Sequence, residues 1–185
     1  NTQNVTNMSF MFNGCTNLNP TSPILTLDLN SVTDPSGTQA MFQNCSSLQD
    51  LSLNNTQNVT NMSFMFYGCT NLNPTSPILT LDLSSNTNCF SMFQDCSSLQ
   101  DLSLNNTQNV TNMSFMFNGC TNLNPTSSIL TLDLNSVTDP SGTQSMFQNC
   151  SSLEDLSLNN TQNVTNMEFM FYGCTNLNPT SPILT

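Results

Sequence analysis

The chain has 185 residues, of which 6% are charged, and its formal net charge is −11 because it contains no Lys, Arg or His. The missing cations exclude nucleic acids and anionic membranes as partners, since proteins bind both through Lys and Arg. No apolar run approaches the roughly 20 residues that span a bilayer, so membrane insertion is not expected either.

One phrase, NVTNMSFMFNGCTNL at residues 4–18, returns with small changes at 58–72, 109–123 and 163–177. Repeats of this kind indicate a solenoid, in which each repeat forms one coil and packs on its neighbours. We expect a single uncapped array of about seven coils over residues 1–185. The array divides into superrepeats 1–54, 55–105, 106–159 and a partial 160–185.

A finer pattern, Met-Phe-x-x-Cys-x-x-Leu, recurs in every coil. Its members are predicted to form core columns, because identical positions of consecutive coils lie over one another. Spacing that matches the coil period favours core packing over a cofactor or copper site. The predicted core ladder consists of Met11, Phe12, Cys15, Leu18, Met41, Phe42, Cys45, Leu48, Met65, Phe66, Cys69, Leu72, Met92, Phe93, Cys96, Leu99, Met116, Phe117, Cys120, Leu123, Met146, Phe147, Cys150, Leu153, Met170, Phe171, Cys174 and Leu177.

Each coil also carries a short alternating segment, LTLDL or LSL, the first of which lies at 25–29. Alternation with a period of two is typical of a half-buried strand. Stacked in register, these strands would form a parallel β-sheet on one side of a right-handed solenoid. The MSFMF segments would fill the other side as short helical, 3₁₀ or irregular arcs. Long and short coils alternate, because the long ones carry NPTSPILT, whose prolines predict an extended loop.

The run NVTNMSFMFNGCTNL, set between Leu-x-Leu segments, resembles the BspA-type leucine-rich repeats and, more closely, the related surface-protein repeats of mycoplasmas and other bacteria. The resemblance covers essentially the whole chain. It implies a leucine-rich-repeat solenoid and a secreted or cell-surface protein, used in adhesion or of unknown role. The absence of Lys and Arg and the regular alternation of coil length depart from this family.

Eight cysteines leave two interpretations open. A secreted chain with this number suggests a disulfide framework. The column cysteines could instead form a ladder of buried free thiols, which we favour. Coils about 4.8 Å apart do not suit a bridge whose Cβ atoms lie about 3.8 Å apart. Cys89 lies outside the column as core filler or as a bridging partner, and without His or a C-x-x-C motif a zinc site is not expected.

Three carboxylates recur on the exposed side of alternate strands, at Asp28, Asp82 and Asp133. They predict either a solvated face or a weak Ca²⁺ site, since hard cations take clustered oxygen ligands. We expect no other cofactor or metal. We also expect no catalytic residue, because the chain has no His for a Ser-His or Cys-His pair and no glycine-rich phosphate loop.

The N-glycosylation pattern N-x-S/T is unusually dense, and it predicts covalent glycans along the solenoid. The competing interpretation is that these Asn and Thr residues form the turns of each coil. The candidate acceptors are Asn4, Asn7, Asn44, Asn54, Asn58, Asn61, Asn105, Asn109, Asn112, Asn149, Asn159 and Asn163.

These features favour a structural solenoid outside the cell or on its surface. Exposed solenoid ends invite stacking, so the expected partners are copies of the chain, joined end to end into a filament. The alternative for the same ends is that the chain is a segment of a longer array that forms a cell-surface stalk. The first alternative is an adhesin whose strand face or NPTSPIL loops recognise a glycan or a host protein. The second alternative, from the Thr and Asn regularity, is an ice-binding protein.

Overall fold

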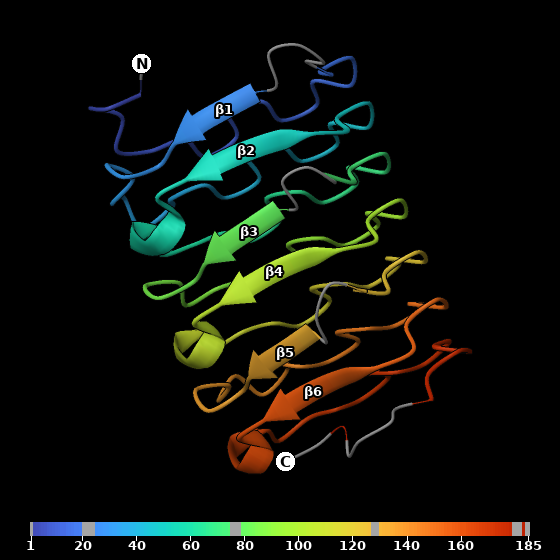
Figure 1. The fold of residues 1–185 in the computed structure, drawn as a ribbon. Helices are drawn as coiled ribbons and strands as arrows, with labels where there is room; N and C mark the ends of the chain where they lie inside the picture. The colour runs from blue at the N-terminus through green and yellow to red at the C-terminus, as the bar shows by residue number, and fades with distance from the viewer. Residues whose placement is uncertain (1, 20–24, 75–78, 127–129, 179–182, 184–185) are drawn as a thin grey trace.

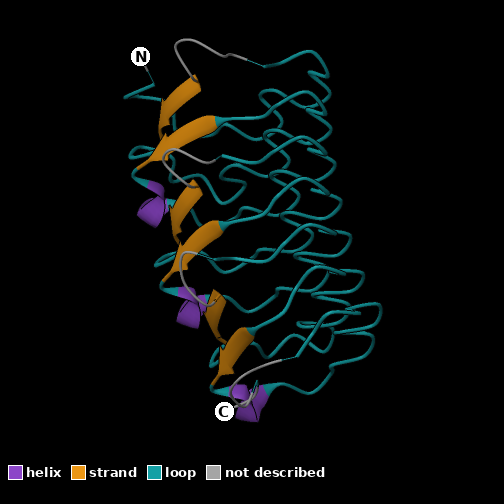
Figure 2. Cartoon of the chain, turned by 45° about the vertical axis from the view of Figure 1, so that its right-hand side comes forward, coloured by secondary structure: helices purple, strands orange, loops and turns teal. Residues whose placement is uncertain are grey.

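The computed structural model describes residues 2–19, 25–74, 79–126, 130–178 and 183. The chain forms a parallel β-solenoid, whose coils follow one another from the N-terminus to the C-terminus (Figure 1). Short strands lie on one side of the coils, and the described remainder consists mainly of loops and turns (Figure 2). The predicted solenoid fold is therefore confirmed.

The strands have the predicted alternating pattern and occur where the Leu-rich segments predict them. In β1, Leu27 is buried while Asp28 is half-buried, as one face of the strand meets the core. The described strands are β1 (Leu25–Asp28), β2 (Leu51–Asn54), β3 (Leu79–Asp82), β4 (Leu102–Asn105), β5 (Leu130–Asp133) and β6 (Leu156–Asn159).

The sequence predicts one parallel sheet that continues along the solenoid, but the sheet in the structure is interrupted. It consists of three two-stranded parallel sheets, β1-β2, β3-β4 and β5-β6. In β1-β2, Leu25 pairs with Leu51 and Leu27 with Leu53, so leucines of neighbouring coils face the core together. The interruption falls after each LSLN strand.

A 3₁₀ helix follows each LSLN strand at this point. The helices η1 (Thr56–Asn58), η2 (Thr107–Asn109) and η3 (Thr161–Asn163) follow β2, β4 and β6. The chain enters η1 through Asn55, whose φ of 57° is in the left-handed region that Asn tolerates better than most residues. The 3₁₀ segments therefore lie beside the strands and not in the MSFMF wall.

A threonine hydroxyl replaces the missing backbone pairing. The Asp82 N–H donates to Thr56 Oγ1 at 2.8 Å, and the same hydroxyl donates to the Asp82 carbonyl at 3.1 Å. Thr107 repeats both bonds with Asp133, at 2.7 and 3.2 Å. The Thr of the TQN phrase thus connects coils where the strands do not pair.

The wall formed by residues 62–69 and their equivalents, here the arc wall, is a run of consecutive turns. The Cys69 amide donates to the Phe66 carbonyl of its own coil at 3.0 Å, whereas the Phe66 amide donates to the Met92 carbonyl of the next coil at 2.9 Å. Amides thus bond in alternation within and between coils. The predicted irregular arc is present, with a backbone ladder of its own.

The core columns run through the arc wall. The stacked rings are Phe12, Phe42, Phe66, Phe93, Phe117, Phe147 and Phe171, with successive centroids 5.2, 5.5, 5.3, 5.6, 5.3 and 5.9 Å apart and planes at most 12° from parallel. Met41, Met65, Met92, Met116, Met146 and Met170 are buried, as are Leu48, Leu72, Leu99, Leu123 and Leu153. Identical apolar side chains therefore meet their counterparts in the adjoining coil.

The predicted core ladder fails at the outermost coils. Met11 is 50% exposed and Cys15 is also exposed, so their assignment to the core was wrong. Phe12, Leu18, Phe171, Cys174 and Leu177 are only partly buried. The physical reason is that a solenoid side chain is covered by coils on both of its sides, and within the described residues these coils have a neighbour on one side only.

Candidate functional site

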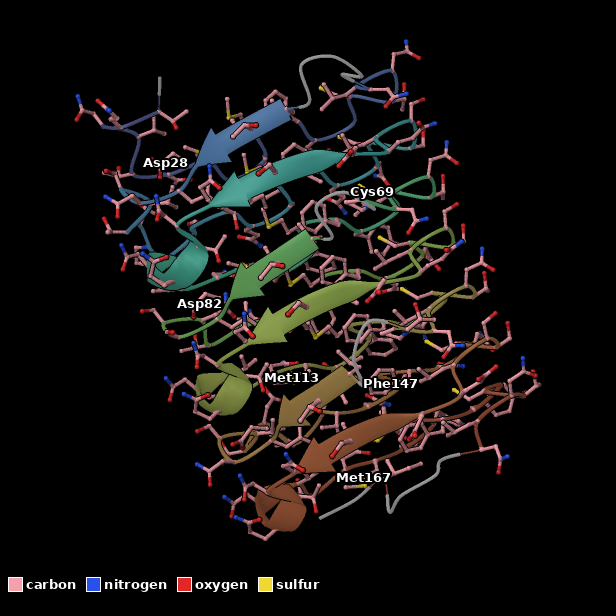
Figure 3. The ribbon with its side chains drawn as sticks, viewed as in Figure 1. Asp28, Cys69, Asp82, Met113, Phe147 and Met167 are labelled. Carbon is pink, nitrogen blue, oxygen red and sulfur yellow. The ribbon has the colours of Figure 1, made fainter. Side chains whose placement is uncertain are left out.

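The column cysteines are free thiols. Cys69, labelled in Figure 3, donates from Sγ to the Phe42 carbonyl of the preceding coil at 3.0 Å. The same bond joins Cys45 to Phe12, Cys96 to Phe66, Cys120 to Phe93, Cys150 to Phe117 and Cys174 to Phe147, at 3.0 to 3.1 Å. All eight cysteines are free, as the thiol-ladder interpretation predicted and the disulfide interpretation did not.

Burial makes the thiols of the inner coils chemically quiet. Loss of solvation raises the pKa of Cys45 to about 11 and that of Cys96 still further. The thiolate is the reactive form of cysteine, so a raised pKa suppresses nucleophilic and metal-binding chemistry. Cys89 is also buried and donates to Asn86 Oδ1 at 3.2 Å, so it fills the core and bridges to no other cysteine.

The calcium candidates Asp28, Asp82 and Asp133 lie at the ends of β1, β3 and β5, and the first two are labelled in Figure 3. The Asn55 side-chain amide donates to Asp28 Oδ1 at 2.9 Å, and the Asn30 backbone amide donates to it at 3.0 Å. These bonds, the first being the larger effect, lower the pKa of Asp28.

The other two candidates are bonded in the same way. The Ser84 hydroxyl and then the Asn106 side chain lower the pKa of Asp82. The Asn160 amide donates to Asp133 Oδ2 at 2.9 Å. Each carboxylate closes a turn and accepts a bond from a neighbouring coil. No group of three or more His, Cys, Asp or Glu that could hold a metal occurs among the described residues, so the weak Ca²⁺ site stays a prediction.

Half of the N-glycosylation candidates have a structural role. Asn58, Asn109 and Asn163 donate from Nδ2 to the backbone carbonyls of Asn30, Ser84 and Asn135, at 3.0, 2.7 and 2.7 Å. Asn7, Asn61 and Asn112 accept at Oδ1 from the amide two residues later, at 2.8, 2.9 and 3.0 Å. Nδ2 is the atom that carries a glycan, so glycosylation of the first three would place a sugar at a contact between coils and leave one N–H to donate.

The remaining acceptor candidates are placed differently. Asn4, Asn44, Asn54, Asn105 and Asn149 are exposed, and Asn159 is half-buried. Asn44 and Asn149 have an additional packing role, because Cβ atoms added at Gly68 and Gly173 would approach their Oδ1 atoms to 2.6 and 2.5 Å. Asn54 and Asn105 are exposed acceptors at the ends of β2 and β4.

A shallow polar groove of about 400 Å³, not predicted from the sequence, lies across successive coils. Its lining comes from successive coils, at positions two and four after the column cysteine. The lining residues are Gln49, Asn71, Asn73, Ser98, Gln100 and Asn122. The recurrence of polar residues at these two sequence positions can be seen in the sequence. That they line one groove cannot be seen there, because it depends on how the coils stack.

The groove amides differ from those elsewhere on the surface. Asn73 Oδ1 accepts from the Gln100 backbone amide at 3.1 Å. By contrast, within the described part of the chain the side-chain amides of Gln49, Asn71, Gln100 and Asn122 make no hydrogen bond with protein. The groove therefore presents donors and acceptors that the fold does not use, and no charged side chain lines it.

The chain is similar to solved leucine-rich-repeat structures. No curated protein matches it. Among solved structures, it is similar to a leucine-rich repeat protein of T. pallidum, with 20% identity, a TM-score of 0.47, and 91% of this chain and 69% of that one covered. A leucine-rich repeat protein from Bacteroides ovatus is similar at 15% identity, with a TM-score of 0.32 and 92% and 62% covered.

The family match extends over nearly the whole chain. The model of the family described as "Mycoplasma protein of unknown function, DUF285" matches residues 1–102, 36–153 and 87–182. Within the described residues, no helix is long and apolar enough to cross a membrane. The resemblance to mycoplasma-type repeats is confirmed, and the chain belongs to the DUF285 family.

Proposed function

We propose that the chain is a structural solenoid outside the cell or on its surface, which stacks end to end on copies of itself and so extends a filament or stalk. The observation that carries the proposal is the Phe column, in which rings from Phe12 to Phe171 stack without interruption. A column of this kind has no preferred length, because every coil meets the next through the same contacts.

The outermost described coils supply the stacking surfaces. Phe10 is 55% exposed and Met11 50% at one end, while Phe169 is 53% and Tyr172 63% exposed at the other. In the inner coils the equivalents of Met11 are fully buried by the adjoining coil, such as Met65 at 0%. In this proposal, a coil of another copy covers the exposed residues. An open head-to-tail contact of this type produces a fibre.

Sedimentation and negative-stain electron microscopy over a range of protein concentrations test the assembly. We expect rods that lengthen with concentration, and Phe10→Asp should weaken association about tenfold or more, because it puts a charge into an apolar contact. Asn17→Asp adds the same charge to an exposed polar residue of the same coil and should leave association unchanged. Monomers at every concentration would contradict end-to-end assembly.

The two alternative functions and glycosylation remain predictions. The NPTSPIL loops proposed for adhesion lie largely outside the described residues. For ice binding, Asn58 and Asn109 direct their amides to the backbone of neighbouring coils and not outward, which weakens the case. A thermal-hysteresis assay decides the second alternative, and the intact mass of the native protein reports attached sugars.

A further inference from the structure

The groove lined by Gln49, Asn71, Asn73, Ser98, Gln100 and Asn122 crosses consecutive coils, so it runs along the solenoid axis. Gln49 and Asn71 follow the cysteines of adjacent coils, and Ser98 and Asn122 belong to the next two. A ligand that fills it must therefore extend over several coils. An elongated chain of similar units fits a lining that itself repeats.

The groove presents hydrogen-bonding capacity that is free for a ligand. Asn55, Asn58 and Asn106 each donate from Nδ2 to a neighbouring coil, so their amides stabilise the fold. The side-chain amides of Asn71 and Gln100 make no such bond in the described residues. An amide side chain offers two donors and an acceptor, which matches a hydroxyl group that both donates and accepts.

The charge of the site selects against ionic ligands. The net charge of −11 and the absence of Lys and Arg repel anions. A cation finds no carboxylate among the lining residues. One established mode of recognising an extended peptide is pairing with a free strand edge, and this groove, which is built from side-chain amides, does not offer one. A neutral, hydroxyl-rich chain remains as the ligand whose chemistry fits.

We propose that this groove binds a neutral polysaccharide, whose chain lies along the solenoid axis across successive coils. The site goes beyond the structural role proposed above and does not depend on end-to-end assembly. Hydroxyl groups of consecutive sugars would bond to Gln49, Asn71, Gln100 and Asn122. Affinity for each sugar is low, because exposed hydrogen bonds exchange with water, and it increases with the number of coils engaged.

Titration calorimetry with the full chain tests the proposal, using the neutral hexasaccharides laminarihexaose, hexa-N-acetylchitohexaose and cellohexaose as probes. We expect at least one to bind with a dissociation constant on the order of 1 mM or lower, and its monosaccharide to bind more weakly. The double variant Asn71→Ala/Gln100→Ala should weaken this binding about tenfold or more, because it removes two amides from the centre of the groove.

A matched control uses the same two repeat positions outside the groove. Asn176 and Asn178 are exposed and follow Cys174 by two and four residues, so Asn176→Ala/Asn178→Ala should bind the hexasaccharide as the original chain does. Circular dichroism confirms that both variants fold. The proposal is overturned if none of the hexasaccharides binds, if both double variants bind equally well, or if an uncharged Gly-Ser hexapeptide binds as tightly and is lost in the same variant.

Discussion

The arc wall and the strand wall belong to the same coils but connect them differently. In the arc wall, Phe66 donates to Met92 and Phe93 donates to Met116, and this bond recurs between all described neighbouring coils, beside the Phe and Cys columns. The strands β1 to β6 pair only two by two. The β-strands, which are the most visible feature of the fold, are therefore not what makes the array continuous.

The largest expected difference between the walls appears at alkaline pH. Burial raises the pKa values of Cys69, Cys89, Cys96, Cys120 and Cys150 above their ordinary value of 9.0. Above about pH 8.5 the folded chain therefore binds more protons than the unfolded chain, and the free energy of unfolding falls as pH rises. Each thiol contributes about 1.4 kcal/mol per pH unit, and together they contribute several.

Guanidinium unfolding followed by circular dichroism at pH 7 and at about pH 9.5 measures this effect. Cys120→Ala should reduce the slope of the free energy of unfolding against pH by the equivalent of about one proton. Stability that is constant from pH 7 to 10 would contradict the buried thiols.

Asp28 and Asp82 in the strand wall change stability at acidic pH instead. Hydrogen bonds lower their pKa values, so their contribution is present above about pH 4 and disappears as pH falls below it, and it is small because both carboxylates are only half-buried and water screens them.

Interrupting the Phe column should have the next largest effect. Phe93 is fully buried, with its ring 5.3 Å from that of Phe66 and 5.6 Å from that of Phe117. Phe93→Ala should lower the free energy of unfolding by about 3–5 kcal/mol, because it leaves a cavity between two rings. Phe115→Ala removes a half-buried ring outside the column and should cost about 1–2 kcal/mol. Equal losses would show that the column has no special weight.

In the arc wall, a glycine of one coil lies against an Asn or Asp of the neighbouring coil. Filling this contact should have a smaller and more specific effect. Gly119 has φ of +77°, and a Cβ there would lie 2.5 Å from Asp95 Oδ1. Gly119→Ala should cost about 2–3 kcal/mol, from left-handed strain plus this contact. Gly14 has φ of +73° but no atom within 4 Å of its added Cβ, so Gly14→Ala isolates the strain, at about 1 kcal/mol. If the two variants unfold at the same denaturant concentration, the contact between coils is unimportant.

Removing the hydroxyl bridge of the strand wall should have the smallest effect. Thr107→Val preserves shape but leaves the Asp133 N–H without its acceptor, so the free energy of unfolding should fall by about 1–2 kcal/mol. Thr121→Val removes an exposed hydroxyl whose bond to the Ser97 carbonyl is 3.3 Å long, and it should change stability by less than about 0.5 kcal/mol. A loss as large as that of Phe93→Ala would reverse the ranking of the two walls.

The coil period was sufficient to predict the columns and the strands. Phe66 and Cys69 recur at constant offsets, and Leu27 alternates with Asp28, so their burial follows from periodicity alone. Periodicity does not say which coils lie at the edge of the described array. Met11 has the same letters around it as buried Met116, yet it is exposed because burial depends on a neighbouring coil.

Other features depend on backbone geometry that local residue preferences do not predict. Phe64 and Phe115 both adopt φ of 58°, a left-handed conformation that a bulky residue normally avoids. It is imposed by the turns that place Met65 and Phe66 in the core. The groove was missed for a related reason, since Asn58 and Asn71 look alike in sequence, and only the fold shows that the first bonds to another coil and the second does not.

Hydrogen exchange of individual backbone amides measures most directly whether the arc wall holds the coils together. The amides of Phe66, Phe93 and Phe117, which donate to the next coil at 2.9 Å, should exchange only through global unfolding and be at least as protected as the amides of β3 and β4. If these amides exchange rapidly while the strand amides stay protected, the arc wall does not unite the solenoid and the account is contradicted.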